Sequence, residues 1–326
     1  MRKRRYEYGG YLPFELPNRK EYFDFLPESH IFRVNAGRTA FYSAVKALKV
    51  HKVYTPYLNC ANSVDPIIAA GADIEYYFLN DDLTPKNVTL KDGEAILWIN
   101  YYGNASEETI QKVYEKYSNL IMDNCNAFWS LPLENAYNCY SARKFFGVAD
   151  GAYLIHPNIS NVNLNFQEDT SANETEFLLK TIEMGTNSCY NENLKNEERL
   201  CDNYKIMSPL TKRILSSIDY STIREIRQKN LLRLHKNIGH KNKFKVNIKS
   251  KTQMYYPFLV EQDSLRERLI KERIYTPTWW RHVPKQSGYA TLETWLSKYM
   301  VFLPIDQRYD ENDMDVIADI VLKLVD

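Results

Sequence analysis

Residues 95–126, AILWINYYGNASEETIQKVYEKYSNLIMDNCN, contain two short apolar runs separated by an amphipathic stretch. The first run, 95–99, is apolar at every position, which is typical of a parallel strand covered by helices on both faces. The stretch from Ser106 to Tyr117 predicts a helix, and the run 120–122 predicts a second strand. This strand–helix–strand unit indicates an open α/β sheet, whose ligand site lies at the carboxyl ends of the strands.

The alternation of helices and strands continues toward both ends of the chain. Before this unit, the spacing of apolar residues predicts helices over 39–49 and 61–70 and strands over 53–55 and 74–79. After it come predicted strands over 152–155, 255–260 and 274–277 and predicted helices over 220–237, 264–272 and 311–324. We therefore expect a large α/β domain over residues 1–207 and a smaller C-terminal α+β domain over residues 208–326.

The charge balance of the chain argues against several kinds of partner. Its 42 Lys and Arg residues are matched by 41 Asp and Glu residues, so the formal net charge is +1. Because no overall field draws such a chain onto polyanions, we predict neither a nucleic-acid nor a membrane partner. The basic start, MRKRR, is followed by no apolar run, which indicates a solvated arm and no signal peptide or transmembrane segment.

The cysteines and histidines argue against disulfides and metal sites. Five cysteines are an odd number and none are spaced as CxxC, and the six histidines are scattered along the chain. We therefore predict a cytoplasmic protein that holds no metal. The sequence also has no GxxxxGK[ST], GxGxxG, GxSxG or HExxH motif, so phosphate-loop, dinucleotide, hydrolase-elbow and zincin functions have no direct support.

Two polar segments at strand ends are candidate ligand sites. The segment 35–40, NAGRTA, is a glycine turn that opens a helix, and the free N–H groups of such a turn can hold a phosphate. Its alternative interpretation is an ordinary helix start with Thr39 near the cap. The segment 123–126, DNCN, puts the carboxylate of Asp123 directly after a strand, where an Asx turn is the alternative.

A third segment, 140–147, has the sequence YSARKFFG and precedes Asp150 and Gly151. Lys144 lies between the hydroxyl of Ser141 and two phenylalanines. Partial desolvation there would make its amine nucleophilic toward a carbonyl. The alternative is a solvated pair of basic surface residues.

In their order and spacing, the three segments resemble the DegT/DnrJ/StrS group of sugar aminotransferases, which are fold type I enzymes that use pyridoxal 5′-phosphate (PLP). The likeness covers most of the chain and extends to the segments Pro56–Cys60, Tyr102–Asn104 and Phe302–Ile305. It implies an aspartate-aminotransferase-like large domain with a mixed, mostly parallel sheet, together with a smaller C-terminal domain.

The resemblance also implies roles for the polar residues of the central segments. Lys144 matches the lysine that forms the internal aldimine with PLP and then serves as general base and acid. Asp123 matches the carboxylate that keeps the pyridinium nitrogen protonated. Asn126 falls where the family has Gln or His beside the phenolic oxygen of the ring.

Other matches concern the phosphate and the faces of the cofactor ring. Gly37 and Arg38 match the phosphate-binding turn, and Ser141 matches a hydroxyl that contacts the same phosphate. The segment that carries Ser141 and Lys144 is shorter than in the family. Cys60 aligns with an aromatic residue that stacks on the ring, and Tyr57 is the candidate substitute for that stacking.

The C-terminal part offers candidates for substrate binding. Arg281 and His282, which follow Trp279 and Trp280, align with a substrate-facing loop and are candidates to bind the carboxylate of the amino donor. Packing around the two tryptophans is the alternative. Asn203 is the candidate for an asparagine that, in the family, reaches the site of a partner subunit.

The function implied is a PLP-dependent aminotransferase that moves an amino group from glutamate to a keto-sugar nucleotide and works as a homodimer. Two alternatives share the fold: a PLP enzyme of another class, such as a dehydratase or lyase, and a non-catalytic dimeric binding protein. An oxidoreductase is a more distant alternative, because the dinucleotide glycines are missing.

The chain also has 25 tyrosines and only 14 phenylalanines. Because a tyrosine buries a ring and keeps a hydroxyl, we expect many of them to line polar clefts or interfaces. Tyr57, Tyr101, Tyr102 and Tyr140 fall in the predicted site loops.

Overall fold

The computed structural model describes residues 8–162, 164–201 and 203–325, so the basic start MRKRR, predicted to be a solvated arm, lies outside the described residues. A seven-stranded sheet has the order β1-β7-β6-β5-β4-β2-β3. Its strands are β1 (Ile31–Val34), β2 (Lys52–Pro56), β3 (Asp73–Tyr77), β4 (Glu94–Ile99), β5 (Leu120–Asp123), β6 (Tyr137–Ser141) and β7 (Ala152–Ile155). In this order, β6, β5, β4, β2 and β3 are parallel to their neighbours in that group. Strand β7 is antiparallel to both β6 and β1. The predicted mixed, mostly parallel sheet is confirmed.

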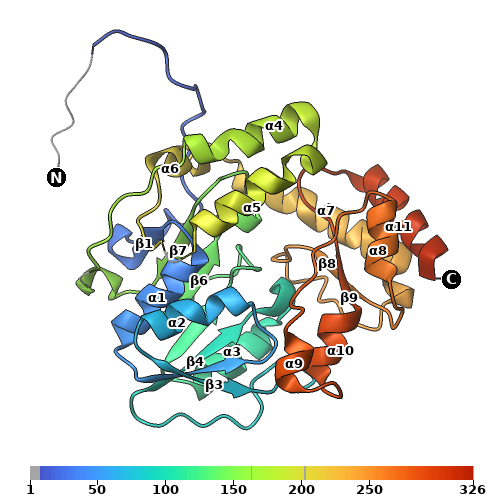
Figure 1. Cartoon of the computed structure of the whole chain (residues 1–326), viewed down its shortest axis with the longest axis horizontal. Helices are drawn as coiled ribbons and strands as arrows, with labels where there is room; N and C mark the ends of the chain where they lie inside the picture. The colour runs from blue at the N-terminus through green and yellow to red at the C-terminus, as the bar shows by residue number, and fades with distance from the viewer. Residues whose placement is uncertain (1–7, 163, 202, 326) are drawn as a thin grey trace.

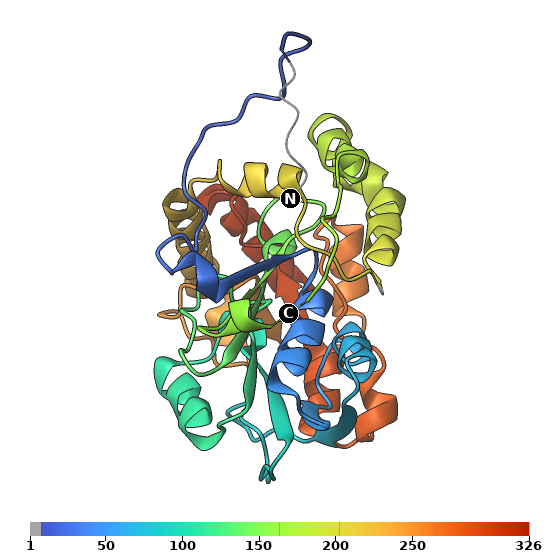
Figure 2. The same cartoon turned by 90° about the vertical axis from the view of Figure 1, so that its left-hand side faces the viewer.

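Helices cover both faces of this sheet, and β4 shows why its sequence is apolar throughout. Figures 1 and 2 place α1 (Gly37–Leu48) and α2 (Asp65–Ala69) on one face and α3 (Glu107–Lys116) on the other. Ala95 and Leu97 pack in the core with α1, whereas Ile96 and Trp98 pack in the core with α3. Because successive side chains of a strand point to opposite faces, both faces of β4 are buried.

The C-terminal part surrounds a two-stranded antiparallel sheet of β8 (Tyr256–Leu259) and β9 (Met300–Leu303). Its helices are α6 (Pro209–Leu215), α7 (Tyr220–Ile238), α8 (Leu265–Lys271), α9 (Val283–Ser287), α10 (Leu292–Tyr299) and α11 (Glu311–Val325). A separate apolar core lies between this sheet and α7, α8 and α11, as expected of a smaller α+β domain. The boundary between residues 207 and 208 stays a prediction.

One predicted strand, 274–277, is wrong. These residues have no regular secondary structure, although Ile274 is buried in the core. The neighbouring N–H of Phe302 donates to the side-chain Oγ1 of Thr276 at 2.9 Å instead of to a backbone carbonyl. Pro277 has no N–H to contribute to a ladder, so the segment packs beside β9 without pairing with it.

Two helices near the end of the predicted large domain were not expected from the sequence. They are α4 (Glu176–Met184) and α5 (Tyr190–Arg199), which lie next to each other across one end of the large domain (Figure 1). On α5, Asn196 donates from its side-chain amide to the carbonyl of Ala149 at 2.7 Å. Glu197 forms an ion pair with Arg143, so α5 is tied to the loop that follows β6.

No helix of the described ranges is long and apolar enough to span a membrane.

Gly103 allows the turn after β4 to pass close to the C-terminal part. Its φ is +69°, and a Cβ at this position would lie 2.6 Å from the carbonyl oxygen of Thr252. We expect Gly103→Ala to lower the free energy of unfolding by about 2–3 kcal/mol, because the strained backbone and the contact with Thr252 add up. Urea denaturation measures the change. Gly147→Ala is the matched control, because no atom lies within 4 Å of its added Cβ; a similar loss in both variants would contradict the explanation.

Candidate active site

The candidate site forms where two neighbouring parallel strands end. Asp123 is the last residue of β5 and pairs in register with Cys139 of β6. A single 3-10 turn, η4 (Ala142–Lys144), follows β6 and carries Lys144 at its end. The amine Nζ of Lys144 donates to Oδ1 of Asn126 at 3.1 Å. The structure thus brings Lys144, Asn126 and Asp123 together, as the sequence predicts.

The Asp123 carboxylate is almost completely buried, with 7% of the residue exposed. Its Oδ1 accepts a hydrogen bond from the backbone N–H of Cys125 at 2.8 Å. Burial raises the pKa of Asp123, and the positive charge of Lys144 and the bond from Cys125 only partly oppose this shift. A buried carboxylate of this kind gains most from a cationic partner, such as a protonated ring nitrogen, placed against it.

This pKa shift predicts that the cofactor-free protein is stabilised by Asp123→Asn near neutral pH. A pKa that is raised on folding means that the ionised carboxylate destabilises the native state. The penalty is absent below the unfolded-state pKa of about 3.9, grows as the pH rises from there to the native-state pKa, and stays constant above it. Asn keeps the acceptor for the Cys125 N–H but carries no charge. We expect a higher melting temperature for the variant near pH 7 and equal values at the lowest pH tested; a lower value near pH 7 would contradict the shift.

The first turn of α1 lies against the Asp123 loop. A Cβ on residue 37 would lie 3.2 Å from Sγ of Cys125, so Gly37 permits the close approach of the two segments. No side chain caps this helix, because its N-cap residue is Ala36; the hydroxyl of Thr39, in the first turn, donates to Oδ1 of Asn35 at 2.6 Å. The first N–H groups of α1 therefore stay available to an anion.

The two other predicted phosphate ligands differ in where they lie. Ser141 is buried at the end of β6, directly before the turn that carries Lys144. The guanidinium of Arg38 extends toward α5, where its Nη1 lies 3.3 Å from the carbonyl oxygen of Glu197 and 2.9 Å from Sγ of Cys201. A role for Arg38 at a phosphate stays a prediction.

The two candidates for stacking on the cofactor ring lie after β2. Cys60 is partly exposed and precedes the 3-10 turn η2 (Ala61–Ser63), which packs against α1. The ring of Tyr57 instead packs on Tyr76 at 5.0 Å and on Phe78 at 4.6 Å between centroids. Of these two residues, Cys60 thus lies on the element next to α1, and Tyr57 belongs to an aromatic group beside the edge strand β3.

The predicted substrate residues of the C-terminal part lie just before α9. Arg281 lines a cleft of about 950 Å³ together with Arg266, whose pKa is lowered by burial and by the charge of Arg281. His282 is half-buried, and its Nε2 has no hydrogen-bond partner among the described residues. Burial lowers the pKa of His282, so a neutral imidazole is favoured.

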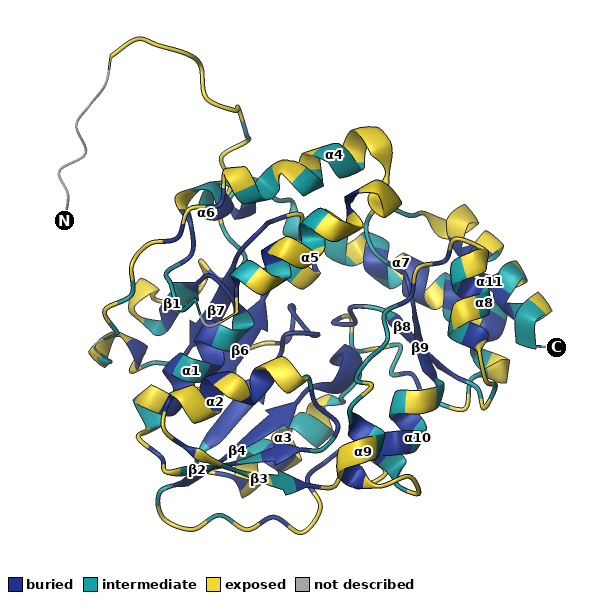
Figure 3. Ribbon diagram, in the orientation of Figure 1, coloured by how far each residue is buried: buried dark blue, intermediate teal, exposed yellow. Residues whose placement is uncertain are grey.

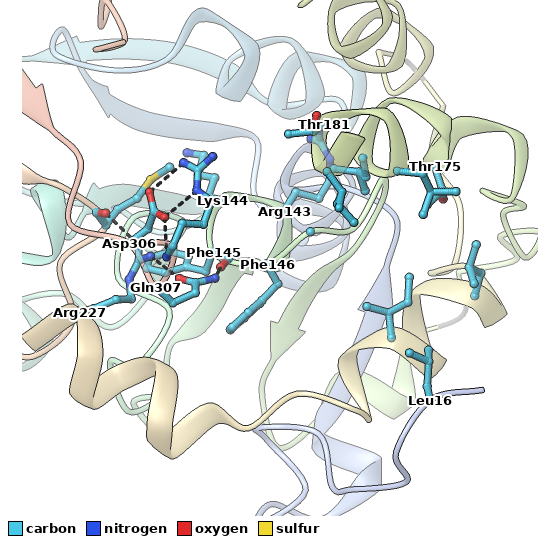
Figure 4. A pocket seen from close by; sticks show the side chains of 18 of the residues that line it. Leu16, Arg143, Lys144, Phe145, Phe146, Thr175, Thr181, Arg227, Asp306 and Gln307 are labelled. Atoms are coloured by element: carbon cyan, nitrogen blue, oxygen red, sulfur yellow. Dashed lines mark hydrogen bonds and ion pairs between the residues drawn. The ribbon is translucent and has the colours of Figure 1, made fainter. Parts of the chain in front are cut away.

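A second pocket, of about 750 Å³, opens at Lys144 (Figure 4). One end, near Lys144, is polar, and Figure 4 shows Asp306 and Gln307 there. The other walls are mainly apolar and come from the N-terminal arm, α4 and α6; they include Phe14, Leu16, Leu178, Leu179, Ile182, Leu210 and Ile214. Tyr255, Asp306 and Arg308 line both this pocket and the cleft of Arg281. Asp123 and Gly37 do not line the pocket of about 750 Å³, whereas Lys144 does. Lys144 therefore connects this pocket with the part of the site that contains Asp123 and Gly37.

Several residues around Lys144 were not identified from the sequence. Arg143 pairs with Glu197, and Arg227 and Gln307 contact the loop after Lys144 from the C-terminal part. These contacts join residues more than fifty positions apart, and no local pattern marks them.

Within the described ranges, no group of three His, Cys, Asp or Glu residues is arranged to hold a metal ion.

Solved structures resemble the chain in fold at low sequence identity. No protein-family model matches the chain, and no curated protein matches it in sequence. The chain is 14% identical to the sugar aminotransferase CalS13 from Micromonospora echinospora, with a TM-score of 0.62 over 90% of this chain and 87% of that chain. It is 15% identical to a DegT DnrJ EryC1 StrS aminotransferase from Brucella abortus, with a TM-score of 0.61 over 91% of this chain and 86% of that chain.

A third structure, NtdA from Bacillus subtilis, was solved with the cofactor pyridoxamine 5′-phosphate (PMP) bound. It is 12% identical, with a TM-score of 0.62 over 90% of this chain and 73% of that chain. The three likenesses confirm the predicted fold, which is that of sugar aminotransferases of the DegT group, over about nine-tenths of the chain.

Proposed function

We propose that the chain is a PLP-dependent aminotransferase that transfers an amino group from glutamate to a keto-sugar nucleotide. The observation that carries this proposal is the position of the Lys144 amine. It lies at the end of one parallel strand, bonded to Asn126, beside the buried carboxylate that ends the next strand. An amine and a desolvated carboxylate in this arrangement are what a PLP-dependent transaminase requires.

The residues at the site fit PLP in chemical type. The amine of Lys144 would hold the cofactor covalently, and the carboxylate of Asp123 would bind its ring nitrogen. The uncapped N–H groups of α1, which Gly37 brings against the Asp123 loop, would bind its phosphate. Bound PLP supplies the electron-withdrawing ring that makes loss of a proton from an amino-acid Cα possible. The PMP reported for the Bacillus subtilis structure supports the same cofactor.

Each residue then has a defined task. Asp123 keeps the proton on the ring nitrogen, because it is buried and the hydrogen bonds from Cys125 only partly offset its burial. Lys144 binds the cofactor and, when its amine is free, removes the proton from Cα of the donor and returns a proton to the acceptor carbon. Asn126 orients Lys144 through the 3.1 Å hydrogen bond.

The cleft around Arg281 supports an anionic acceptor. Four arginines (Arg266, Arg273, Arg281 and Arg308) and two aspartates (Asp306 and Asp313) line it, and Arg308 is paired with Asp306; Tyr190, Tyr275 and Tyr309 add aromatic surface. Arg266 and Arg281 repel each other, since the charge of Arg281 contributes to lowering the pKa of Arg266. An anion between them relieves this repulsion, so the cleft suits a phosphorylated substrate.

A homodimer is supported by apolar surface close to the site. On α4, Leu179, Ile182 and Met184 are at least half exposed, and the N-terminal arm carries Tyr11 and Phe14 in the same state. Figure 3 shows this arm and much of α4 as exposed. Such a surface is suited to a partner subunit.

All five cysteines are free, in line with a cytoplasmic location.

The acceptor is tested with purified protein, PLP, glutamate and a panel of 3-keto and 4-keto nucleotide sugars. Mass spectrometry should show replacement of one carbonyl oxygen by an amino group in at least one sugar, together with one 2-oxoglutarate for each product. If glutamate is converted but no sugar in the panel is aminated, the proposed acceptor is wrong. If PLP does not bind, the proposed enzyme class is wrong.

A further inference from the structure

Arg227, on α7, is a buried arginine behind the Lys144 loop. It is 4% exposed, and no carboxylate of the described residues forms an ion pair with it. Its Nη1 donates to Oε1 of Gln307 and its Nη2 donates to the carbonyl of Met254, both at 2.8 Å, while Nε has no partner. Burial lowers the pKa of Arg227 to about 10. Because a buried cation without a direct ion pair is costly, and the charge of Asp306 offsets only part of that cost, stability alone does not account for an arginine here.

The guanidinium of Arg227 contacts the two loops that form the site. It lies 4.9 Å from the ring centroid of Phe145 and 5.6 Å from that of Trp129. Phe145 directly follows Lys144, and Trp129 follows Asn126 by three residues. The two rings meet edge to face at 5.1 Å. Arg227 therefore links both site loops to α7.

Gln307 provides a second contact to the same loop. Its Nε2 donates to the backbone carbonyl of Phe145 at 2.8 Å, while its Oε1 accepts from Arg227. Figure 4 shows Arg227, Gln307 and Phe145 close together beside Lys144. The ring and the carbonyl of Phe145, the residue after Lys144, are thus both held from the C-terminal part of the chain.

We propose that Arg227 and Gln307 are positioning residues for Lys144. By holding the ring and the carbonyl of Phe145, they fix the direction in which the Lys144 amine points relative to Asn126 and Asp123. The position of the C-terminal part is thereby coupled to the position of the amine. The chemical meaning of this coupling rests on the proposed aminotransferase function, but the geometric claim can be tested without cofactor.

Two variants at one position separate geometry from charge. Gln307→Glu retains an acceptor for Arg227, gives it a counter-ion, and loses the donor to Phe145. Gln307→Met is neutral and loses both bonds. Any effect common to the two variants therefore reports the lost bond to Phe145 and not the change in charge. Gln262→Glu is the matched control, because Gln262 also donates to a backbone carbonyl, that of Leu324 at 2.8 Å, at a site remote from Lys144.

The measurement is the rate at which an amine-reactive acylating reagent labels Lys144 in the full-length, cofactor-free protein. Peptide mass spectrometry follows it, with exposed Lys91 as the internal reference. We expect both Gln307 variants to label Lys144 about threefold faster or more, the population change that follows from the loss of one hydrogen bond. Gln262→Glu should leave the rate unchanged, and Gln307→Glu should keep the wild-type melting temperature.

Three outcomes are decisive. An unchanged Lys144 rate in both Gln307 variants would overturn the inference, and a lower melting temperature with an unchanged rate would assign Gln307 a purely structural role. An equal change in the Gln262 variant would also overturn it. Failure of the wild-type protein to bind PLP would contradict the proposed function but would leave the labelling result valid.

Discussion

Lys144→Ala should remove covalent PLP attachment and slow amino transfer from glutamate by about a thousandfold or more, the scale of losing a positioned acid–base group together with covalent binding. The reason is that the described site offers one amine beside Asp123, the one bonded to Asn126. The readouts are the rate of 2-oxoglutarate formation and the mass of peptides after borohydride reduction in the presence of PLP. The wild type should carry one reduced cofactor on the peptide that contains Lys144.

The matched control is Lys91→Ala, since Lys91 is exposed and lies before the amino end of β4, away from the carboxyl ends of the strands where the site forms. This variant should keep both the activity and the mass increase of the wild type. A reduced adduct that persists at full yield on another lysine in Lys144→Ala would show that the assignment of Lys144 is wrong.

Asp123→Asn should lower kcat by about a hundredfold to a thousandfold, as expected for removal of one charged group that stabilises the reacting state. A neutral amide cannot keep a proton on the cofactor nitrogen, whereas the N–H bond from Cys125 still orients the side chain. Steady-state kinetics with glutamate measure the change, and borohydride reduction should still attach PLP to Lys144.

Stability and activity should move in opposite directions in this variant. We expect the cofactor-free protein to melt at a higher temperature near pH 7, because burial raises the pKa of Asp123. A lower kcat in a more stable protein cannot arise from unfolding. Asp73→Asn, at an exposed position, should alter neither property. Wild-type kcat in Asp123→Asn would rule out the proposed role of the carboxylate.

The middle of the central sheet could be predicted from the sequence because β4 and β5 are buried on both faces. An apolar run such as 95–99 indicates a strand buried on both faces when a helix pattern and a second apolar run follow it. The position of Asp123 follows from the same logic, since it comes directly after the predicted strand 120–122 and the carboxyl ends of parallel strands meet at one edge of a sheet. Lys144 follows β6 (Tyr137–Ser141), a strand that was not predicted, so its place at this edge rested on the family resemblance alone. The site was thus predictable to the extent that it depends on strand order.

Features that depend on distant partners could not be predicted. The helices α4 and α5 have mostly exposed or partly exposed side chains, and Asn196 is the one buried residue of the two helices. Arg227 and Gln307 reach the Phe145 loop from positions 82 and 162 residues away. The segment 274–277 is apolar enough for a strand, but it contacts β9 through the side chain of Thr276.

The excess of tyrosines has a structural explanation that differs from the expectation. Several tyrosines are buried in the core and donate their hydroxyl to a backbone carbonyl, instead of lining a polar cleft. Examples are Tyr77 to Leu97 at 2.8 Å, Tyr101 to Leu58 at 2.7 Å and Tyr140 to Ser130 at 2.9 Å. Burial raises the pKa of all three tyrosines well above the ordinary value. The hydroxyls thus satisfy backbone carbonyl groups inside the core, and two of these, of Leu58 and Ser130, lie in loops.

The central claim is that Lys144 and Asp123 form the site of a PLP-dependent transaminase. The most direct test mixes the purified, PLP-loaded protein with excess glutamate in the absence of any acceptor and counts the 2-oxoglutarate released. The proposed function predicts one 2-oxoglutarate for each bound cofactor, with no further release until a keto substrate is added. Continued release of product without an acceptor, or no 2-oxoglutarate from protein that has bound PLP, would contradict it.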